Sequence, residues 1–320
     1  MRAAAQAQPN FALIKYWGKK DLDSNLPAVG SLSITLDSLW TRMTVEYSDD
    51  FGEDRLQVNG RSDQPMLPRI VHCLDLVAGK GRSPAMVHSQ SNFPIGAGLA
   101  SSASAFAALV VAAEAAAGGS RGTLPLARLA GRASGSAARS LFGGFAELTV
   151  IDEVIEVEQL LAHHDWPLQV IVALTAETAK PLGSGDGMIR SAATSPFYSS
   201  WVGQQEQDLT TAHAAVMTRN FDKLAAVAEH NCLKMHSVMW TSRPPIVYWN
   251  RSTLSCMETV RDLQNDGHAV FFTIDAGPQL KAVCLPDAAT AVAAALAETP
   301  GVIRVMQSGL GPGARLLETE

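Results

Sequence analysis

The sequence has 320 residues, of which 47% are hydrophobic and 18% charged, and its formal net charge is −6. This length and apolar content are enough for a substantial core, so we expect one large domain or two modest lobes and little disorder. No dense run of Lys and Arg is present, which argues against a nucleic-acid-binding protein. A negatively charged chain still binds small phosphates where a few cations and backbone N–H groups converge.

The four cysteines are scattered along the chain, with no Cys-x-x-Cys pair and no histidine at metal-ligand spacing. This pattern favours free thiols in a reducing compartment over a disulfide framework or a zinc site. The N-terminal stretch lacks the apolar segment of a secretory signal. The longest apolar stretch, residues 105–118, contains Glu114 and is too short to cross a bilayer. We therefore expect a cytoplasmic protein that makes no contact with a membrane.

The first half of the chain combines strands and helices. Local alternation of apolar residues predicts strands at residues 31–47 (two strands joined by a turn), 85–88, 145–151 and 168–174. Helical spacing predicts helices at residues 66–77, 101–117, 124–133 and 134–141. Gly118 and Gly119 end the second of these helices, which is rich in alanine.

The second half is largely helical. Helices are predicted at residues 210–216, 221–240, 246–265 and 288–296, and strands at residues 269–274, 280–284 and 302–307. Because strands and helices mix without strict βαβ alternation, we expect an α+β fold. The polar stretch 180–186 is the candidate boundary between an N-terminal lobe (1–179) and a C-terminal lobe (180–320). It is equally a candidate for a mobile active-site loop.

A loop rich in glycine and serine, Pro94–Ser102, carries the most informative local chemistry. Its glycines allow the backbone to turn tightly and to approach a ligand. Ser101 and Ser102 fall in the first turn of the following helix, where free N–H groups and the helix dipole favour anions. On the residues alone, phosphate binding and simple helix capping remain equally good interpretations. The two commonest nucleotide motifs, GxxxxGK[ST] and GxGxxG, are absent.

Several blocks together resemble a known family. The segment PIGAGLASSASA resembles the phosphate loop of the superfamily of galactokinase, homoserine kinase, mevalonate kinase and phosphomevalonate kinase. More specific blocks resemble mevalonate diphosphate decarboxylases: NFALIKYWGK (10–19), NFP (92–94), SGSAARSLFGG (134–144) and IDAGP (274–278). Weaker matches lie at 180–195, 235–236 and 248–250, and SGLGPG near the end also fits.

The resemblance implies a two-lobed fold of this small-molecule kinase superfamily, with the active site in the cleft between the lobes. It implies ATP and Mg²⁺ as cofactors and a homodimer. It also implies ATP-dependent decarboxylation of mevalonate 5-diphosphate to isopentenyl diphosphate, through phosphorylation of the 3-hydroxyl, in the mevalonate pathway of isoprenoid biosynthesis.

Three catalytic residues are implied: Asp275, Lys15 and Arg139. Asp275 ends a predicted buried strand, where spacing alone favours an Asx turn; the resemblance implies the catalytic carboxylate beside the substrate's tertiary hydroxyl. Lys15 follows the strand-like run 11–14, and its charge would lower the pKa of a neighbouring carboxylate. Arg139, by itself a surface helix residue, is implied to bind the substrate's carboxylate or phosphate.

The binding residues are implied in the same way, with Ser102 also a candidate Mg²⁺ ligand. The ATP phosphates would be held by Gly96, Gly98, Leu99, Ala100, Ser101 and Ser102. The substrate would be held by Tyr16, Trp17, Lys19, Ser134, Ser136, Arg139 and Ser184. From the residues alone, Tyr16 and Trp17 are expected in a core and Lys19 on a solvated surface.

Two segments depart from the family pattern. Val29 and Gly30 stand where relatives commonly have Asn and Ser, so polar contacts are missing. Asp186 stands where a phosphate-contacting Ser is expected, and its charge would repel a diphosphate. The substrate's phosphate tail therefore stays open, and the alternatives are a mevalonate 5-phosphate decarboxylase or a mevalonate 3-kinase. A non-catalytic ligand-binding homologue is the alternative from a different class.

Overall fold

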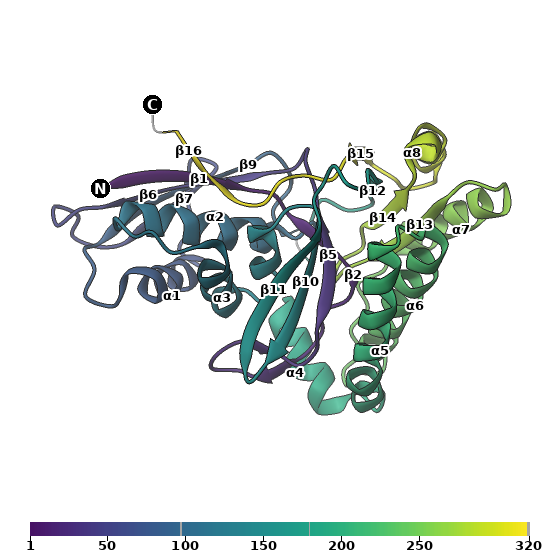
Figure 1. Ribbon diagram of the computed structural model, residues 1–320, viewed down its shortest axis with the longest axis horizontal. Coiled ribbons are helices and arrows are strands. Elements are labelled where there is room, and N and C mark those ends of the chain that lie inside the picture. Colours follow the sequence, from purple (N-terminus) through teal and green to yellow (C-terminus); the bar gives the residue numbers. More distant parts are fainter. Residues whose placement is uncertain (97, 179, 319–320) are drawn as a thin grey trace.

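The structure, a computed structural model, describes residues 1–318 except 97 and 179 (Figure 1). Residue 179, the expected end of the N-terminal lobe, and residue 320, the end of the C-terminal one, lie outside the described residues. Within the described part, helices and strands mix without βαβ repetition, and the strands form sheets of six, four, four and two strands. The expected α+β fold is confirmed.

The six-stranded sheet has the order β16-β1-β6-β9-β7-β8, with β7 and β9 parallel and its other pairs antiparallel. Its strands are β1 (Arg2–Ala7), β6 (Thr41–Tyr47), β7 (Arg55–Val58), β8 (Arg61–Ser62), β9 (Ala85–Ser91) and β16 (Arg315–Leu317). Because β16 pairs with β1, the first and last strands of the chain lie side by side (Figure 1).

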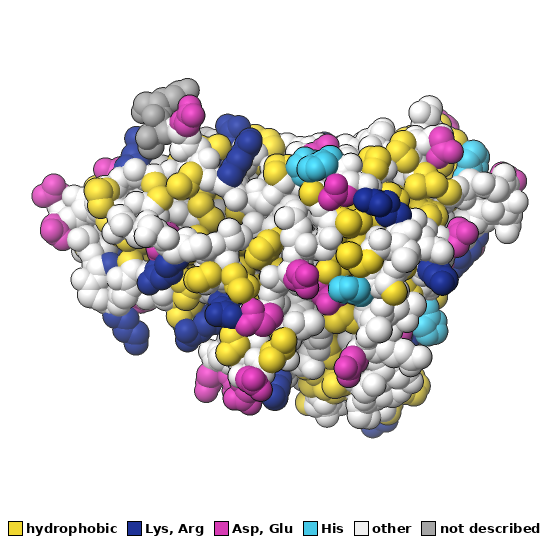
Figure 2. All heavy atoms as spheres, in the orientation of Figure 1, with side chains coloured by type: hydrophobic (Ala, Val, Ile, Leu, Met, Phe, Trp, Pro, Cys, Tyr) yellow, Lys and Arg dark blue, Asp and Glu magenta, His cyan; other side chains and the backbone are white. Residues whose placement is uncertain are grey.

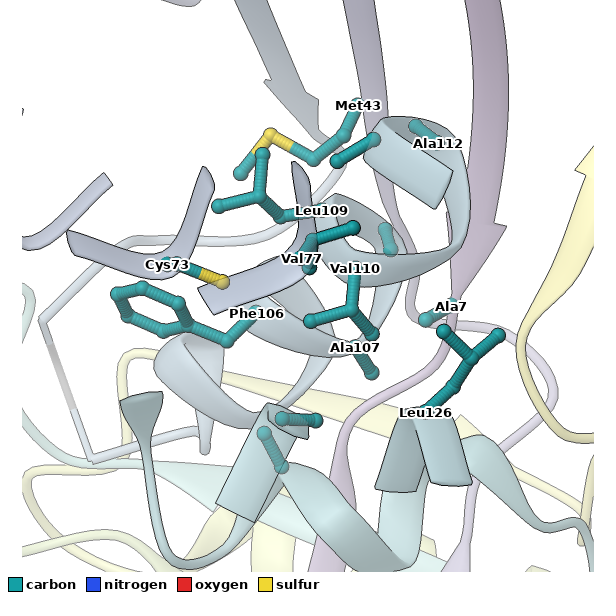
Figure 3. Close-up of a cluster of buried hydrophobic side chains, with 14 of the residues drawn as sticks. Ala7, Met43, Cys73, Val77, Phe106, Ala107, Leu109, Val110, Ala112 and Leu126 are labelled. Carbon is teal, nitrogen blue, oxygen red and sulfur yellow. The ribbon is translucent and has the colours of Figure 1, made fainter. Parts of the chain in front are cut away.

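Two helices pack on this sheet, α1 (Leu67–Ala78) and α2 (Ser101–Ala116), and α3 (Thr123–Ala133) packs against both of them and against the central sheet described next. α2 is buried on almost all sides because its alanines and aliphatic residues let its neighbours approach closely. Figure 3 places Leu109 beside Met43 of β6, and Phe106 beside Cys73 of α1. Each large side chain fully buried here stabilises the fold by about 1.5–3 kcal/mol. This packing fixes the start of α2, and with it the glycine-rich loop.

A central four-stranded sheet follows the order β11-β10-β5-β2. Its strands are β2 (Asn10–Ile14), β5 (Ser31–Thr35), β10 (Phe145–Ile151) and β11 (Val154–Leu161). Short strands β3 (Lys19–Asp21) and β4 (Leu26–Pro27) form the two-stranded sheet. In place of the helix expected at 134–141, a single 3₁₀ turn, η1 (Ala137–Leu141), precedes β10. The reason is that hydrogen bonds to the N-terminal segment, Asn10 Nδ2 to Ser136 O and Ser140 Oγ to Gln8 O, hold this stretch instead of helical bonds.

The third sheet, β13-β14-β12-β15, is antiparallel and lies beside the C-terminal helices (Figure 1). Its strands are β12 (Gln169–Leu174), β13 (Val270–Ile274), β14 (Leu280–Cys284) and β15 (Arg304–Ser308). The helices of this half are α4 (Ser184–Thr194), α5 (Tyr198–Met217), α6 (Phe221–Trp240), α7 (Arg251–Asn265), the 3₁₀ turn η2 (Pro286–Ala288) and α8 (Ala289–Glu298). Since β12 pairs with strands from beyond residue 180, the division into lobes 1–179 and 180–320 stays a prediction.

Some predicted bounds were wrong. α4 begins inside the stretch expected to be a loop, and α5 begins at Tyr198 instead of 210. α7 begins at Arg251 instead of 246, because Asn250 and Thr253 form a capping box at that point.

The face in Figure 2 carries acidic and basic side chains interspersed with apolar ones. All four cysteines are free and buried, as expected. Within residues 1–318, leaving out 97 and 179, no helix is long and apolar enough to cross a membrane, and no cluster of His, Cys, Asp and Glu is arranged to hold a metal ion.

Gly144 provides a test of this architecture at the entry to β10. Its φ is +62°, and a Cβ built there would lie 2.2 Å from the carbonyl oxygen of Leu161. We expect Gly144→Ala to lower the free energy of unfolding by more than about 2 kcal/mol, measured by urea denaturation. As a control, Gly203→Ala in the exposed interior of α5, where a Cβ meets nothing within 4 Å, should raise it by about 0.5–1 kcal/mol. Equal stability of Gly144→Ala and the unaltered protein would contradict the close approach.

Candidate active site

A buried ion pair joins the two halves of the chain. Lys15 follows β2 and Asp275 follows β13, and the Nζ of Lys15 lies 2.7 Å from Oδ1 of Asp275. The lysine side chain is 1% exposed and the aspartate 22%, so the carboxylate is the accessible partner. Burial alone would raise the pKa of Asp275, but the charges of Lys15 and Lys281 outweigh it and lower that pKa to about 2. The carboxylate is therefore ionised at neutral pH.

Two amide side chains hold the backbone of Lys15. Asn231 on α6 accepts the Lys15 N–H at 2.8 Å, and Gln205 on α5 donates to the Lys15 carbonyl at 2.6 Å. The Asn231 amide also donates to Gln205 at 2.9 Å, so the two form one network. The lysine itself donates to the carbonyl of Ala12 at 2.7 Å. The ammonium is thus fixed from several directions before any ligand binds.

A second lysine, Lys281 on β14, was not predicted as a site residue. It is fully buried, and its Nζ lies 3.4 Å from Oδ2 of Asp275 and donates to the carbonyl of Gly98 at 3.0 Å. In the sequence it is a single polar residue in the short apolar strand LKAVC. The lone charge in an apolar strand was the available signal; the place of Lys281 beside Asp275 follows from its pairing with Thr273, two residues before Asp275, which only the structure shows.

The glycine-rich loop lies directly against the turn after Asp275. Gly98 has φ +82°, and a Cβ there would lie 3.0 Å from Cα of Gly277. Ala100 has the left-handed conformation just before α2, and the Gly96 N–H donates to Ser101 Oγ at 3.2 Å. The loop is therefore shaped to present the start of α2. That start carries no acidic residue in its first turn, so its free N–H groups and the Ser102 hydroxyl suit a phosphate and its magnesium.

Arg139 lies on η1 and is buried, with 1% of its surface exposed. Its guanidinium donates to Ser33 Oγ at 3.0 Å, to Ser31 Oγ, and to Asn10 Oδ1 at 3.4 Å. None of the carboxylates in the described chain forms an ion pair with it. Burial lowers the pKa of Arg139 to about 10, although the charges of Asp275 and Tyr16 act to raise it. A buried cation with neutral partners is unfavourable alone, which makes this position suited to an anionic ligand.

Other predicted substrate residues gather near Arg139. The Tyr16 hydroxyl lies against Gly135, between Ser134 and Ser136, since a Cβ at Gly135 would lie 2.5 Å from it. Burial raises the pKa of Tyr16 to about 12, although the nearby Arg139 lowers it.

Trp17 differs from the other predicted substrate residues, because it is 1% exposed and packs in an apolar cluster. Its carbonyl accepts a hydrogen bond from Trp201 Nε1 at 2.9 Å. This environment is the one expected of a core residue.

Lys19 is half-buried and lies among charged neighbours. Burial lowers its pKa, Arg69 lowers it further, and Asp186 raises it. Arg69, on α1, was missed; it donates to the carbonyl of Ala133, next to Ser134, at 3.4 Å. The carboxylate of Asp186 thus lies within the electrostatic field of Lys19. It is also in the first turn of α4, where the helix dipole favours a negative charge.

Lys180 was missed too, and it brings Ser184 to the site. Its Nζ donates to Ser184 Oγ at 2.6 Å and to the carbonyl of Ala276 at 2.9 Å. Burial lowers the pKa of Lys180 to about 8; Asp275 opposes this effect and Lys281 adds to it.

The departures at Val29 and Gly30 have packing reasons. Val29 is buried in the apolar cluster that contains Trp17. A Cβ at Gly30 would lie 2.6 Å from the side-chain end of Leu209 on α5 and 3.1 Å from the carbonyl oxygen of Leu148, so a serine there would require Leu209 to move.

The chain matches two family models that together span most of its length. Residues 7–153 match the diphosphomevalonate decarboxylase-like N-terminal domain, and residues 170–306 match the mevalonate 5-diphosphate decarboxylase C-terminal domain. The diphosphomevalonate decarboxylase of Candida albicans is 32% identical, over 97% of this chain and 96% of that protein. The enzyme from Rattus norvegicus is 34% identical, over 91% and 78% respectively.

Solved structures agree with these matches. A structure described as MDDEF in complex with MVAPP, AMPPCP and magnesium has a TM-score of 0.92 and 36% identity, covering 100% of this chain and 99% of its own. Mevalonate diphosphate decarboxylase from Staphylococcus aureus has a TM-score of 0.92 and 33% identity, covering 99% and 98%. The fold is that of the superfamily of galactokinase, homoserine kinase, mevalonate kinase and phosphomevalonate kinase. Within it, the chain belongs to the diphosphomevalonate decarboxylase family.

Proposed function

We propose that the protein is an ATP-dependent diphosphomevalonate decarboxylase, which converts mevalonate 5-diphosphate to isopentenyl diphosphate in isoprenoid biosynthesis. The observation that carries the proposal is the Lys15–Asp275 ion pair of 2.7 Å beside a phosphate-type loop, with Gly98 against Gly277. Family membership in both halves of the chain supports it. The relatives' complexes with MVAPP, AMPPCP and magnesium support the same pair of substrates and the metal ion.

The reaction has to overcome two chemical obstacles. A tertiary hydroxyl is a poor leaving group, and the carboxylate cannot leave as carbon dioxide without an acceptor for its electrons. Phosphorylation of the 3-hydroxyl makes that oxygen able to depart. Loss of phosphate then leaves positive charge on the tertiary carbon, and decarboxylation supplies the electron pair of the new double bond.

We assign Asp275 to the 3-hydroxyl. Its pKa of about 2 keeps it ionised, so it accepts the hydroxyl's hydrogen bond and orients the oxygen toward the phosphoryl group. Phosphoryl transfer depends mainly on positioning and charge neutralisation, so a weak base suffices. Lys15 holds the carboxylate in its charged form.

We assign Arg139 to the substrate's carboxylate, because it is a buried cation with only neutral partners. The phosphate tail would be held by five residues around this position: Tyr16, Lys19, Ser134, Ser136 and Ser184. Trp17 stays a prediction as a substrate residue, since its burial supports a packing role.

ATP would lie on the glycine-rich loop, with Gly96, Gly98, Leu99, Ala100 and Ser101 shaping the backbone around its phosphates. Bound ATP with magnesium supplies the phosphoryl group and neutralises its charge. Ser102 is the candidate protein ligand of the metal; magnesium commonly keeps several waters and takes few protein ligands beside substrate phosphates.

At the level of the whole protein, we propose a cytoplasmic homodimer with lobes 1–179 and 180–320, on the family resemblance.

The central test is a coupled assay of ADP, phosphate and carbon dioxide with wild type and Asp275→Asn. Wild type should release the three products in equal amounts. Asp275→Asn should lower kcat on the order of 10³-fold with little change in KM, because the amide keeps the shape and loses the charge. Substrate-independent ADP release by wild type, or equal kcat for the two proteins, would contradict the proposal. Absence of any turnover would favour the non-catalytic homologue.

The lowered pKa of Lys180 predicts that activity falls above a certain pH. The ammonium is charged below about pH 8 and neutral above it, so kcat/KM for mevalonate 5-diphosphate should be level below about pH 8 and fall about tenfold per pH unit above it. Lys180→Arg keeps its charge throughout and should move the limit upward. A limit unchanged in Lys180→Arg would assign it to another group, and Lys281, whose pKa is also lowered, is the nearest.

The charge of Asp186 bears on whether the protein prefers the diphosphate or the monophosphate as its substrate. We expect wild type to prefer mevalonate 5-diphosphate over the 5-phosphate, because Lys19 and Arg69 lie near the proposed position of the tail. Asp186→Ser should raise kcat/KM for the diphosphate by about threefold, a modest effect because this carboxylate is exposed and screened. The control Asp266→Ser, on an exposed residue after α7, should change neither value. A preference of wild type for the monophosphate would establish the alternative substrate.

A further inference from the structure

Lys281 contacts both halves of the proposed reaction centre. Its ammonium donates to the Gly98 carbonyl at 3.0 Å and lies 3.4 Å from Oδ2 of Asp275. Gly98 belongs to the glycine-rich loop, and Asp275 is the residue assigned to the hydroxyl. The ammonium also lies 4.6 Å from the centre of the Phe11 ring on β2. One side chain therefore contacts the loop, the carboxylate and the strand that leads into Lys15.

The two oxygens of Asp275 have different surroundings. Oδ1 accepts a hydrogen bond from Lys15 at 2.7 Å. Oδ2 is buried and accepts no well-aligned hydrogen bond in the described chain; the Nζ of Lys281 lies 3.4 Å from it as an ion-pair partner. Lys15 therefore holds Oδ1 and Lys281 lies beside Oδ2, so the two lysines together set the direction of the carboxylate.

A wholly buried lysine is an unfavourable choice for a purely structural position. Lys281 is 0% exposed, and an ammonium removed from water needs compensating partners. Its position in β14 is flanked by apolar residues, and an apolar side chain there would pack at lower cost. The partners it has are the carboxylate and the loop carbonyl, which points to a role in the geometry between them.

We propose that Lys281 is a positioning residue that holds the Asp275 carboxylate and the glycine-rich loop at a fixed separation. The inference rests on the proposed function, in which the loop holds the phosphoryl donor and Asp275 holds the acceptor. Lys281 then acts on the alignment of the two reactants, and Lys15 remains the partner of Oδ1. Loss of Lys281 affects ATP binding through the loop and turnover through the alignment, whereas the site of the phosphate tail, around Arg69 and Lys19, is left intact.

The test uses Lys281→Met and Lys281→Gln in the carbon dioxide assay, with AMPPCP binding measured by calorimetry. Lys281→Met should lower kcat on the order of 10²-fold and raise KM for ATP about tenfold. KM for mevalonate 5-diphosphate should stay within about threefold of wild type. Lys281→Gln keeps an N–H donor for the Gly98 carbonyl, so AMPPCP affinity should recover partly while kcat stays low. Should Lys281→Met fail to fold, the low kcat of Lys281→Gln carries the test.

Glu229→Gln is the matched control. Glu229 is a buried charge on α6 that accepts the N–H of Phe272 in β13 at 3.0 Å, on the sheet that carries Lys281. It should lower thermal stability and leave both KM values and kcat within about threefold. The proposal is overturned if the Lys281 variants lose stability like this control and keep wild-type kcat and KM for ATP. An inactive wild type would instead overturn the proposed function, so the two failures are distinct.

Discussion

The structure depends on one buried electrostatic arrangement, the ammonium of Lys15 against the carboxylate of Asp275. The two residues are 260 positions apart and come from strands of different sheets. Neither charge is tolerable alone at this depth, so the pair forms only when both sheets are in place. The amides of Gln205 and Asn231 then fix the lysine backbone from α5 and α6. The two halves of the fold must therefore be correctly placed against each other for this ion pair to form.

Positive charge exceeds negative charge around this pair. Lys15, Lys281, Lys180 and Arg139 all interact electrostatically with the carboxylate of Asp275. The chain as a whole is negative, at −6. Burial lowers the pKa of both Lys180 and Arg139, and the charge of Asp275 offsets only part of this effect. Polyphosphate ligands supply that counter-charge, which explains how an acidic protein suits highly anionic substrates.

Much of this arrangement could be predicted from the sequence, and the reasons for the misses are physical. Asp275 and the glycine-rich loop lie in short motifs whose chemistry is local, and most long periodic elements, such as α6, were predicted closely. Lys281 and Arg69 sit in ordinary strand and helix patterns, so their roles depend on pairings that periodicity does not contain. The segment of η1 has helical composition, yet contacts with Asn10 and Gln8, more than 120 residues away, decide its conformation.

The low pKa of Asp275 constrains the chemistry. A carboxylate with a pKa of about 2 has little tendency to take a proton, so its value lies in accepting a hydrogen bond and in its fixed charge. A stronger base would need fewer cations nearby, whereas the proposed reaction needs cations close to its phosphates. The site therefore favours charge neutralisation over basicity. This suits a reaction in which the bond to the phosphoryl donor breaks before the hydroxyl loses its proton, because a strong base is then not needed. Alignment of donor and acceptor then becomes the main task of the protein.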